Sequence, residues 1–316
     1  MESVAVTGAA GLIGQRVLLH LERDPGVRRI VALDLRPPER VGEKVVFVRH
    51  DVRDPVDAVL REHGVDTVVH LAFVVDPMHD RKRERAINVG GTERVLEACD
   101  AVNAGTVLLA SSGTVYGAWP DNPPLLTEDA PLRGKPGYPY VEDKLELERM
   151  ASEYAAAHGG CRVLVIRPTV VVGPHMDNFL SRFLLRPVAF RVAGANPPVP
   201  VVHEDDVGEA IWRLLAEDAP GGAYNLNSGV GVPFREALSR LGRRGIPLPA
   251  PVLKTLAGLA WILRLRALSE VPPAMLDFIR WRWSGDGTKI ERETSFRYAF
   301  SADEAMESFI RSHTGR

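Results

Sequence analysis

Residues 4–14 read V-A-V-T-G-A-A-G-L-I-G, and this stretch decides the fold. Its apolar start is typical of a buried parallel strand, and an apolar helical pattern follows its three glycines. Strand, glycine turn and helix in this order form the context that a dinucleotide-binding turn requires. We expect Gly8 to make the tight turn, Gly11 to allow close approach of a pyrophosphate, and Gly14 to let the helix pack closely on the strand.

The next predicted strand strengthens this interpretation. It spans Arg29–Leu35 and carries Asp34 near its end, 20 residues after Gly14. An acidic side chain at this place can accept hydrogen bonds from the hydroxyls of an adenosine ribose. Arg36 could instead pair with a 2′-phosphate. The sequence therefore favours NAD as cofactor and leaves NADP open.

Composition narrows the class of protein. The 316 residues include 39 basic and 41 acidic side chains, a balance that gives no reason to expect a nucleic-acid partner. Cys99 and Cys161 both lie in apolar patterns, so we expect reduced core residues and not a disulfide or a metal site. With no signal peptide and no apolar run of membrane-span length, the chain is expected to be cytoplasmic.

Strand-like runs alternate with helical patterns through the first two thirds of the chain. This alternation predicts an α/β protein with a Rossmann-type, doubly wound parallel sheet. The predicted strands are 4–7, 30–35, 45–48, 67–71, 106–110, 163–167, 200–203 and 223–226, and the predicted helices are 12–22, 55–63, 86–98, 141–158 and 206–217.

The pattern loosens after residue 173, where prolines become dense. We expect residues 1–173 to form the dinucleotide-binding domain, with 198–228 returning to it, and 174–316 to be mainly a smaller substrate-binding portion. Within the latter, 253–265 is strongly apolar. A helix over the substrate pocket or in a dimer contact is favoured there, and a membrane-surface helix, suggested by Lys254, Arg264 and Arg266, is the disfavoured alternative.

Two further motifs carry chemistry. Tyr140 and Lys144 stand four apart in a predicted helix, so both can point into one site. A cation beside a phenol favours the phenolate and lowers the phenol pKa, which would make Tyr140 a general acid or base. Ser112 and Thr114 follow a strand at the sheet edge where ligands bind, and either hydroxyl could hold a reacting oxygen.

Taken together, these motifs resemble the extended short-chain dehydrogenases/reductases, the NAD-dependent epimerase/dehydratase family. The resemblance covers about residues 3–228 and rests on several motifs in the expected order. These are T-G-A-A-G-L-I-G, H-D-V at 50–52, H-L-A at 70–72, N-V-G-G-T at 88–92, S-S-G-T-V-Y-G at 111–117, Y-V-E-D-K at 140–144 and R-P-T-V-V-V-G-P at 167–174.

The resemblance implies a role for each matched residue. Ser112, Tyr140 and Lys144 would be the catalytic set, Asn88 would support the site, and the histidines at 50, 70 and 203 would be structural, with no metal bound. Asp34 would hold the ribose, and Tyr140 and Lys144 would also contact the cofactor. The other cofactor residues would be Gly8, Gly11, Leu12, Ile13, Asp51, Val52, Leu71, Ala72, Phe73 and Pro168, with Thr169 beside the last.

Several departures from the family pattern bear on the reaction. Sugar-nucleotide dehydratases have an Asp-Glu pair where this chain has Gly113-Thr114, so 4,6-dehydration is not expected. Val170 and Val199 stand where relatives carry an asparagine and an arginine that contact a sugar-nucleotide diphosphate. The segment after residue 178 is apolar, which suits a less polar substrate. Its arginines at 182, 186 and 191 could still supply anionic contacts.

The leading hypothesis is an NAD(P)-dependent oxidoreductase that transfers hydride at a secondary alcohol or ketone carbon of a small molecule. A sugar-nucleotide 4-epimerase of the UDP-hexose type, with tightly bound NAD, is the main alternative. A non-catalytic dinucleotide-sensing protein is a third, although such proteins often lose the tyrosine or lysine that this chain keeps. The resemblance also implies a homodimer that pairs through 86–98 and 141–158.

Overall fold

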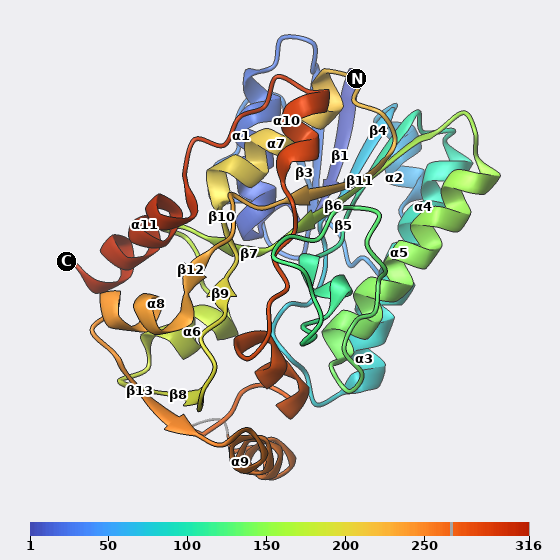
Figure 1. The fold of residues 1–316 in the computed structure, drawn as a ribbon. Helices are drawn as coiled ribbons and strands as arrows, with labels where there is room; N and C mark the ends of the chain where they lie inside the picture. Colours follow the sequence, from blue (N-terminus) through green and yellow to red (C-terminus); the bar gives the residue numbers. More distant parts are fainter. Residues whose placement is uncertain (266–267, 316) are drawn as a thin grey trace.

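The computed structural model describes residues 1–265 and 268–315, and its centre is a seven-stranded parallel sheet (Figure 1). The strand order is β11-β6-β5-β4-β1-β2-β3, with every pair parallel. This confirms the predicted Rossmann-type α/β fold. The strands are β1 (Ser3–Thr7), β2 (Arg29–Asp34), β3 (Val45–Arg49), β4 (Thr67–His70), β5 (Thr106–Ala110), β6 (Arg162–Pro168) and β11 (Gly222–Leu226).

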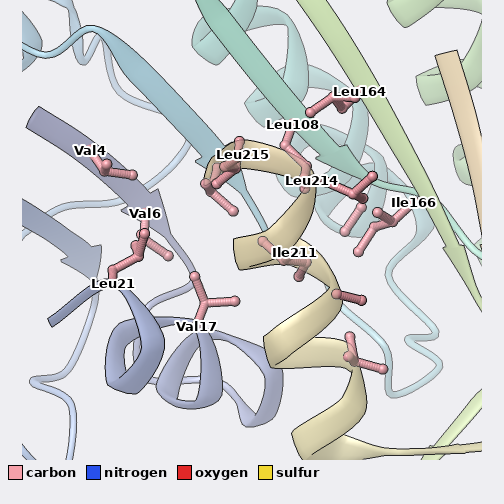
Figure 2. Close-up of a cluster of buried hydrophobic side chains, with 14 of the residues drawn as sticks. Val4, Val6, Val17, Leu21, Leu108, Leu164, Ile166, Ile211, Leu214 and Leu215 are labelled. Atoms are coloured by element: carbon pink, nitrogen blue, oxygen red, sulfur yellow. The ribbon is translucent and has the colours of Figure 1, made fainter. Parts of the chain in front are cut away.

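Helices cover both faces of the sheet, which is why its strands are apolar without alternation. α1 (Leu12–Arg23) and α7 (Glu204–Ala216) pack on one face, against Val4 and Val6 of β1 (Figure 2). Ala5, between those valines, points to the other face. That face is covered by α2 (Asp57–Glu62), α4 (Gly91–Ala101) and α5 (Pro139–Ala157).

The predicted helix 86–98 is interrupted in the structure. A short α3 (Arg81–Arg85) leads into a π-helical turn, η1 (Ala86–Gly90), before α4 begins. The Thr92 hydroxyl donates to the Asn88 carbonyl at 2.7 Å, and Asn88 is fully buried. A π turn inserts one extra residue into a helix and is frequent at functional sites.

The rest of the chain forms a smaller layer beside the sheet's carboxyl edge (Figure 1). Three two-stranded sheets join its strands in the pairs β7–β10, β9–β12 and β8–β13. The strands are β7 (Val170–Val172), β8 (Val188–Val192), β9 (Pro198–Val199), β10 (Val201–His203), β12 (Val232–Pro233) and β13 (Arg244–Leu248). Its helices are α6 (Phe179–Leu185), α8 (Phe234–Arg240), α9 (Ala250–Ile262) and α11 (Ala302–Thr314), with the 3₁₀ helix η3 (Pro273–Ile279). α10 (Thr288–Glu293) instead packs beside β11 near the N-terminus, and the 3₁₀ helix η2 (Gly113–Tyr116) follows β5.

The elements of residues 198–228 divide between the main sheet and the smaller layer. β11 joins the main sheet and α7 packs on it, whereas β10 pairs with β7 outside it and contributes Val202 to the core under α7. β6 ends at Pro168, which has no backbone N–H to donate. The next strand, β7, pairs with β10. Ile290 of α10 and Phe296 belong to the core under α1 and α7. The segment that contains them therefore packs against the main sheet and not in the smaller layer.

Within residues 1–265 and 268–315, no helix is long and apolar enough to cross a membrane.

Candidate active site

One cavity of about 370 Å³ lies at the carboxyl edge of the sheet, where ligands bind in open α/β folds. On one side it is lined by the glycine turn and by the residues that follow β4, β5 and β6. On the other side its walls are apolar side chains from α6, β8, α9 and η3. We refer to this space as the cavity. It contains the predicted residues Gly8, Gly11, Leu12, Ile13, Leu71, Phe73, Ser112, Tyr140, Lys144 and Pro168, along with Gly14, Thr114 and Thr169.

The glycine turn has the geometry that a bound pyrophosphate needs. Gly8 has φ +70°, and a Cβ there would lie 2.7 Å from the backbone nitrogen of Ala72. At Gly14, a Cβ would collide with the carbonyl oxygen of Gly8. α1 starts after Gly11 with no side-chain cap, so its first N–H groups stay available to an anionic ligand. The turn therefore fits a dinucleotide without any side chain contributing to the phosphate site.

Gly8→Ala is expected to destabilise the protein by about 1–3 kcal/mol, because a non-glycine residue is strained at this φ and its Cβ overlaps the Ala72 backbone. It should also weaken NAD binding. Gly64→Ala is the matched control, since Gly64 has φ +58° with no atom within 4 Å of the added Cβ. Urea denaturation and calorimetric titration with NAD measure both effects, and equal losses in the two variants would show that the contact with Ala72 is unimportant.

The residues predicted for the adenosine end lie apart from the cavity. The Asp34 carboxylate accepts hydrogen bonds from the backbone N–H groups of Ala10, at 3.0 Å, and Arg36, at 3.3 Å. It thus holds the glycine turn and remains partly exposed. Asp51 forms a two-pronged ion pair with Arg53, which lowers the pKa of the carboxyl to about 2. Val52 packs where Gly91 leaves room for it.

Ser112 and Tyr140 lie beside each other in the lining of the cavity. Ser112 caps η2, and its Oγ accepts from the backbone N–H of Thr114 at 3.2 Å and from the Thr114 hydroxyl at 2.9 Å. The Tyr140 hydroxyl lies beside Ser112, whose influence opposes the rise of the phenol pKa that burial causes. A serine just past β5 and a tyrosine on α5 therefore present their oxygens to the same point of the cavity.

Lys144 adopts a position that the sequence did not predict. Its Nζ donates to the Ala110 carbonyl at 2.6 Å and lies 3.3 Å from the centre of the Phe73 ring. Burial lowers the pKa of Lys144 to about 7 and raises that of Tyr140 to about 12, against an opposing effect of Ser112. The predicted lowering of the phenol pKa is thus wrong for this structure, because the ammonium is turned toward Ala110 and desolvation dominates.

The buried Lys144 predicts a stability that depends on pH. Its pKa is about 7 in the folded protein against 10.5 in the unfolded chain, so the unfolded chain binds more protons between these values. The free energy of unfolding should therefore rise with pH above 7, by about 1 kcal/mol per unit. Urea denaturation between about pH 7 and 8 measures this slope, before the cysteine thiols of the unfolded chain, with a pKa of about 8.5, are largely ionised. Lys144→Met should flatten the slope, and a wild-type slope that is already flat would contradict the prediction.

Asn88 connects the cavity loop to α5. Its Oδ1 accepts from the backbone N–H of Val74 at 2.8 Å, and its Nδ2 donates to Asp143 at 3.1 Å. Asp143 lies between Tyr140 and Lys144 in the sequence of α5 and is completely buried. It accepts two hydrogen bonds from Arg81, at 2.5 and 2.6 Å. Asn88 thus has the supporting place that the resemblance implied, although Asp143 and Arg81 were missed. An acid inside the Y-V-E-D-K motif was the available signal.

Ser111 is another residue to which sequence reasoning assigned no role. It lines the cavity, and its buried hydroxyl has no hydrogen-bond partner within the described part of the chain. A buried polar atom without a partner is costly, and a polar ligand in the cavity would supply one. This hydroxyl and the uncapped start of α1 both fit a bound nicotinamide dinucleotide.

The histidines lie in hydrogen-bonded positions. His70 is buried between the hydroxyls of Thr7, at 2.7 Å, and Thr92, at 3.1 Å, and burial lowers its pKa to about 3. His203 contacts the Ser308 hydroxyl and stacks on Phe300. Among the described residues, no group of three or more histidine, cysteine or acidic side chains could hold a metal ion.

The chain is similar to known proteins in both sequence and structure. A family model described as the NAD dependent epimerase/dehydratase family matches residues 4–227. The chain belongs to this family. Membership confirms the resemblance found in the sequence and the predicted nicotinamide cofactor, and it supports an enzyme.

Individual relatives cover most of the chain. An uncharacterized protein of Mycobacterium tuberculosis (strain H37Rv) is 28% identical over 98% of this chain and 83% of its own. UDP-glucose 4-epimerase of Azospirillum brasilense is 30% identical over 262 residues, 72% of each chain.

Solved structures share the fold. UDP-glucose 4-epimerase of Thermus thermophilus, in complex with NAD, has a TM-score of 0.76 at 24% identity and covers 98% of each chain. MoeE5, in complex with UDP-glucuronic acid and NAD, has a TM-score of 0.74 at 26% identity, also over 98% of each chain.

Proposed function

We propose that this protein is an NAD-dependent oxidoreductase that transfers hydride at a secondary alcohol or ketone carbon of a small, apolar substrate. The observation that carries the proposal is the placement of Tyr140 beside Ser112 in a cavity whose far walls are apolar. Asp34 at the end of β2 supports NAD over NADP, because its carboxylate would repel a 2′-phosphate.

Ser112, Tyr140 and Lys144 have different roles in the proposed reaction. Ser112 orients the substrate oxygen by a hydrogen bond, and Tyr140 takes the hydroxyl proton during oxidation or returns it during reduction. Lys144 would hold the ribose that carries the nicotinamide. The glycine turn and the start of α1 hold the dinucleotide, and Leu71 and Phe73 border its nicotinamide end. NAD supplies the hydride acceptor, and the protein supplies position and electrostatics.

The substrate side of the cavity favours an apolar molecule. Val170 and Val199 both line it, at the two positions where sugar-nucleotide enzymes of the family carry polar contacts. Among the described lining residues the cations are Lys144 and Arg186, and Arg186 is paired with Glu270 at 2.9 Å. The other walls are largely aromatic and aliphatic, including Phe179, Phe183, Phe190, Phe234, Met275, Phe278, Ile279 and Trp283.

The first test is to denature the purified protein and quantify the nicotinamide cofactor that it releases. We expect little bound cofactor, reversible NAD binding by calorimetry, and NAD reduction with apolar secondary alcohols. Absence of turnover with every such alcohol, together with one NAD retained per chain, would overturn the proposal.

A UDP-hexose 4-epimerase is the second candidate, supported by the 30% identity to the Azospirillum brasilense enzyme. An epimerase restores its own cofactor, so it would retain one NAD per chain and interconvert UDP-glucose with its 4-epimer. Calorimetric titrations with UDP-sugars that all remain silent would exclude it.

A further inference from the structure

A large apolar surface lies at the end of the molecule opposite the N-terminus, around α9 (Figure 1). α9 carries two apolar stripes at helical spacing. Leu253, Ala257 and Ala260 are buried against the protein, whereas the neighbouring stripe is more than 45% exposed. The exposed side chains, which we call the α9 surface, are Val252, Leu256, Leu259, Ile262, Leu263, Leu265 and Leu268, with Val188 and Phe190 of β8 and Ile246 of β13.

The strand pair extends the helix surface into one continuous patch. β8 and β13 pair in parallel with Phe190 opposite Ile246, and α9 packs beside β8. Ile262 is 75% exposed and Leu263 63%. Isolated apolar side chains on a surface are ordinary, but a patch of ten large ones indicates that something covers it.

The charge of this part of the chain indicates what covers it. From residue 243 to 268 the sequence contains five basic residues and no acidic one, in a protein with a net charge of −2. These are Arg243, Arg244, Lys254, Arg264 and Arg266, of which Arg266 lies outside the described residues. Arg244 and Arg264 are exposed beside the apolar side chains.

The neighbouring acidic groups neutralise part of this charge. Lys254 is paired with Asp277 at 2.8 Å, and Arg264 lines a second pocket together with Asp76, Asp80 and Glu270. Glu270 itself is engaged by Arg182 at 3.0 Å and Arg186 at 2.9 Å, and Arg244 remains exposed beside the apolar strand pair. Positive charge around exposed aliphatic side chains is complementary to an anionic lipid surface. A second copy of the chain is a poorer partner, since a two-fold contact would bring the same arginines toward one another.

We propose that the α9 surface binds the surface of an anionic lipid bilayer, with α9 lying flat and its exposed leucines inserted among the acyl chains. The helix over the pocket that the sequence favours is present, since Leu253 and Ala257 line the cavity. The membrane-surface role that the sequence disfavours is proposed here for the other, exposed stripe. The surface also reaches the cavity: Phe190 and Leu268 belong to both. If the proposed function holds, an apolar substrate could pass from the lipid to Tyr140 without crossing water.

Vesicle sedimentation with the full-length protein tests the docking independently of activity. We expect binding to phosphatidylcholine vesicles that contain phosphatidylserine and much weaker binding to phosphatidylcholine alone. Leu256→Ser/Leu259→Ser/Leu263→Ser should reduce binding by roughly tenfold or more, because it removes buried apolar area. Arg244→Gln/Arg264→Gln should reduce it by about tenfold on anionic vesicles only.

Val41→Ser/Val230→Ser is the matched control, because these valines are exposed to a similar degree away from α9. It should bind like the wild type. Two results would overturn the proposal: equal sedimentation of wild type and the triple serine variant, or no vesicle binding by a protein that forms dimers which the triple variant loses in analytical ultracentrifugation. The second result would assign the surface to another copy of the chain.

Discussion

Tyr140→Phe is expected to lower kcat by about 10²–10⁴-fold while leaving NAD affinity within a factor of a few. The change removes one oxygen, the atom that faces Ser112, and keeps the ring that packs against Phe73. Because the ring and its packing are kept, we expect proton transfer to fail rather than folding or cofactor binding. Steady-state kinetics and calorimetric titration with NAD measure the two effects separately.

Tyr138→Phe is the matched control for this variant. Tyr138 also lines the cavity, two residues earlier in the chain, and its ring lies 5.9 Å from that of Tyr140. Loss of its hydroxyl should leave most of the activity. Equal rates for the wild type and Tyr140→Phe would refute the assignment of the general acid/base, whichever substrate is used.

Arg167→Met is expected to destabilise the protein by about 3–5 kcal/mol. The side chains of Arg167 and Glu148 are 6% and 8% exposed and form a two-pronged ion pair at 2.8 and 3.0 Å, which fixes α5 to β6. Arg167 also donates to the Tyr116 hydroxyl at 2.9 Å. Removal of the guanidinium leaves a buried carboxylate without a counter-charge, and this is the costly part of the change.

The double variant Arg167→Met/Glu148→Met separates the free-energy cost of an unpaired buried carboxylate from the net contribution of the ion pair to stability. Because it removes both charges, it should recover a large part of the stability lost in the single variant. Arg94→Met is the surface control: Arg94 and Glu97 pair at 2.6 Å but are about half exposed, so the loss should be about 0.5 kcal/mol or less. Urea denaturation of the wild type and the three variants measures these losses of stability. An Arg167→Met variant that loses no more stability than Arg94→Met would contradict the prediction.

Much of the fold could be predicted from the sequence because its signals are local. Each strand of the main sheet is a short apolar run, and the observed boundaries agree with the predicted ones within one or two residues, as for β5 at Thr106–Ala110. The convergence of Ser112, Tyr140 and Lys144 was also predictable. A residue just past a parallel strand must lie at the sheet's carboxyl edge, and two residues four apart share a helix face.

What could not be predicted depends on contacts between distant residues. Arg81 and Asp143 are 62 positions apart, and no pattern in either segment identifies the other as its partner. The direction of the Lys144 side chain depends on the Phe73 ring and the Ala110 carbonyl, which only the assembled sheet brings within reach. The pairing of β10 with β7 likewise follows from where the chain runs after Pro168.

The two sides of the cavity are built from different kinds of atoms, and this has an evolutionary consequence. The side where we expect the pyrophosphate presents backbone N–H groups and has no side chains at Gly8 and Gly14. Every residue type has the same backbone, so selection there acts on shape and tolerates little change. The opposite side consists of side chains from α6, β8, α9 and η3, outside the main sheet. Substitutions in those walls can change which molecule is accepted while the redox chemistry is inherited intact, so descendants of one ancestor can diversify in substrate without reinventing the reaction.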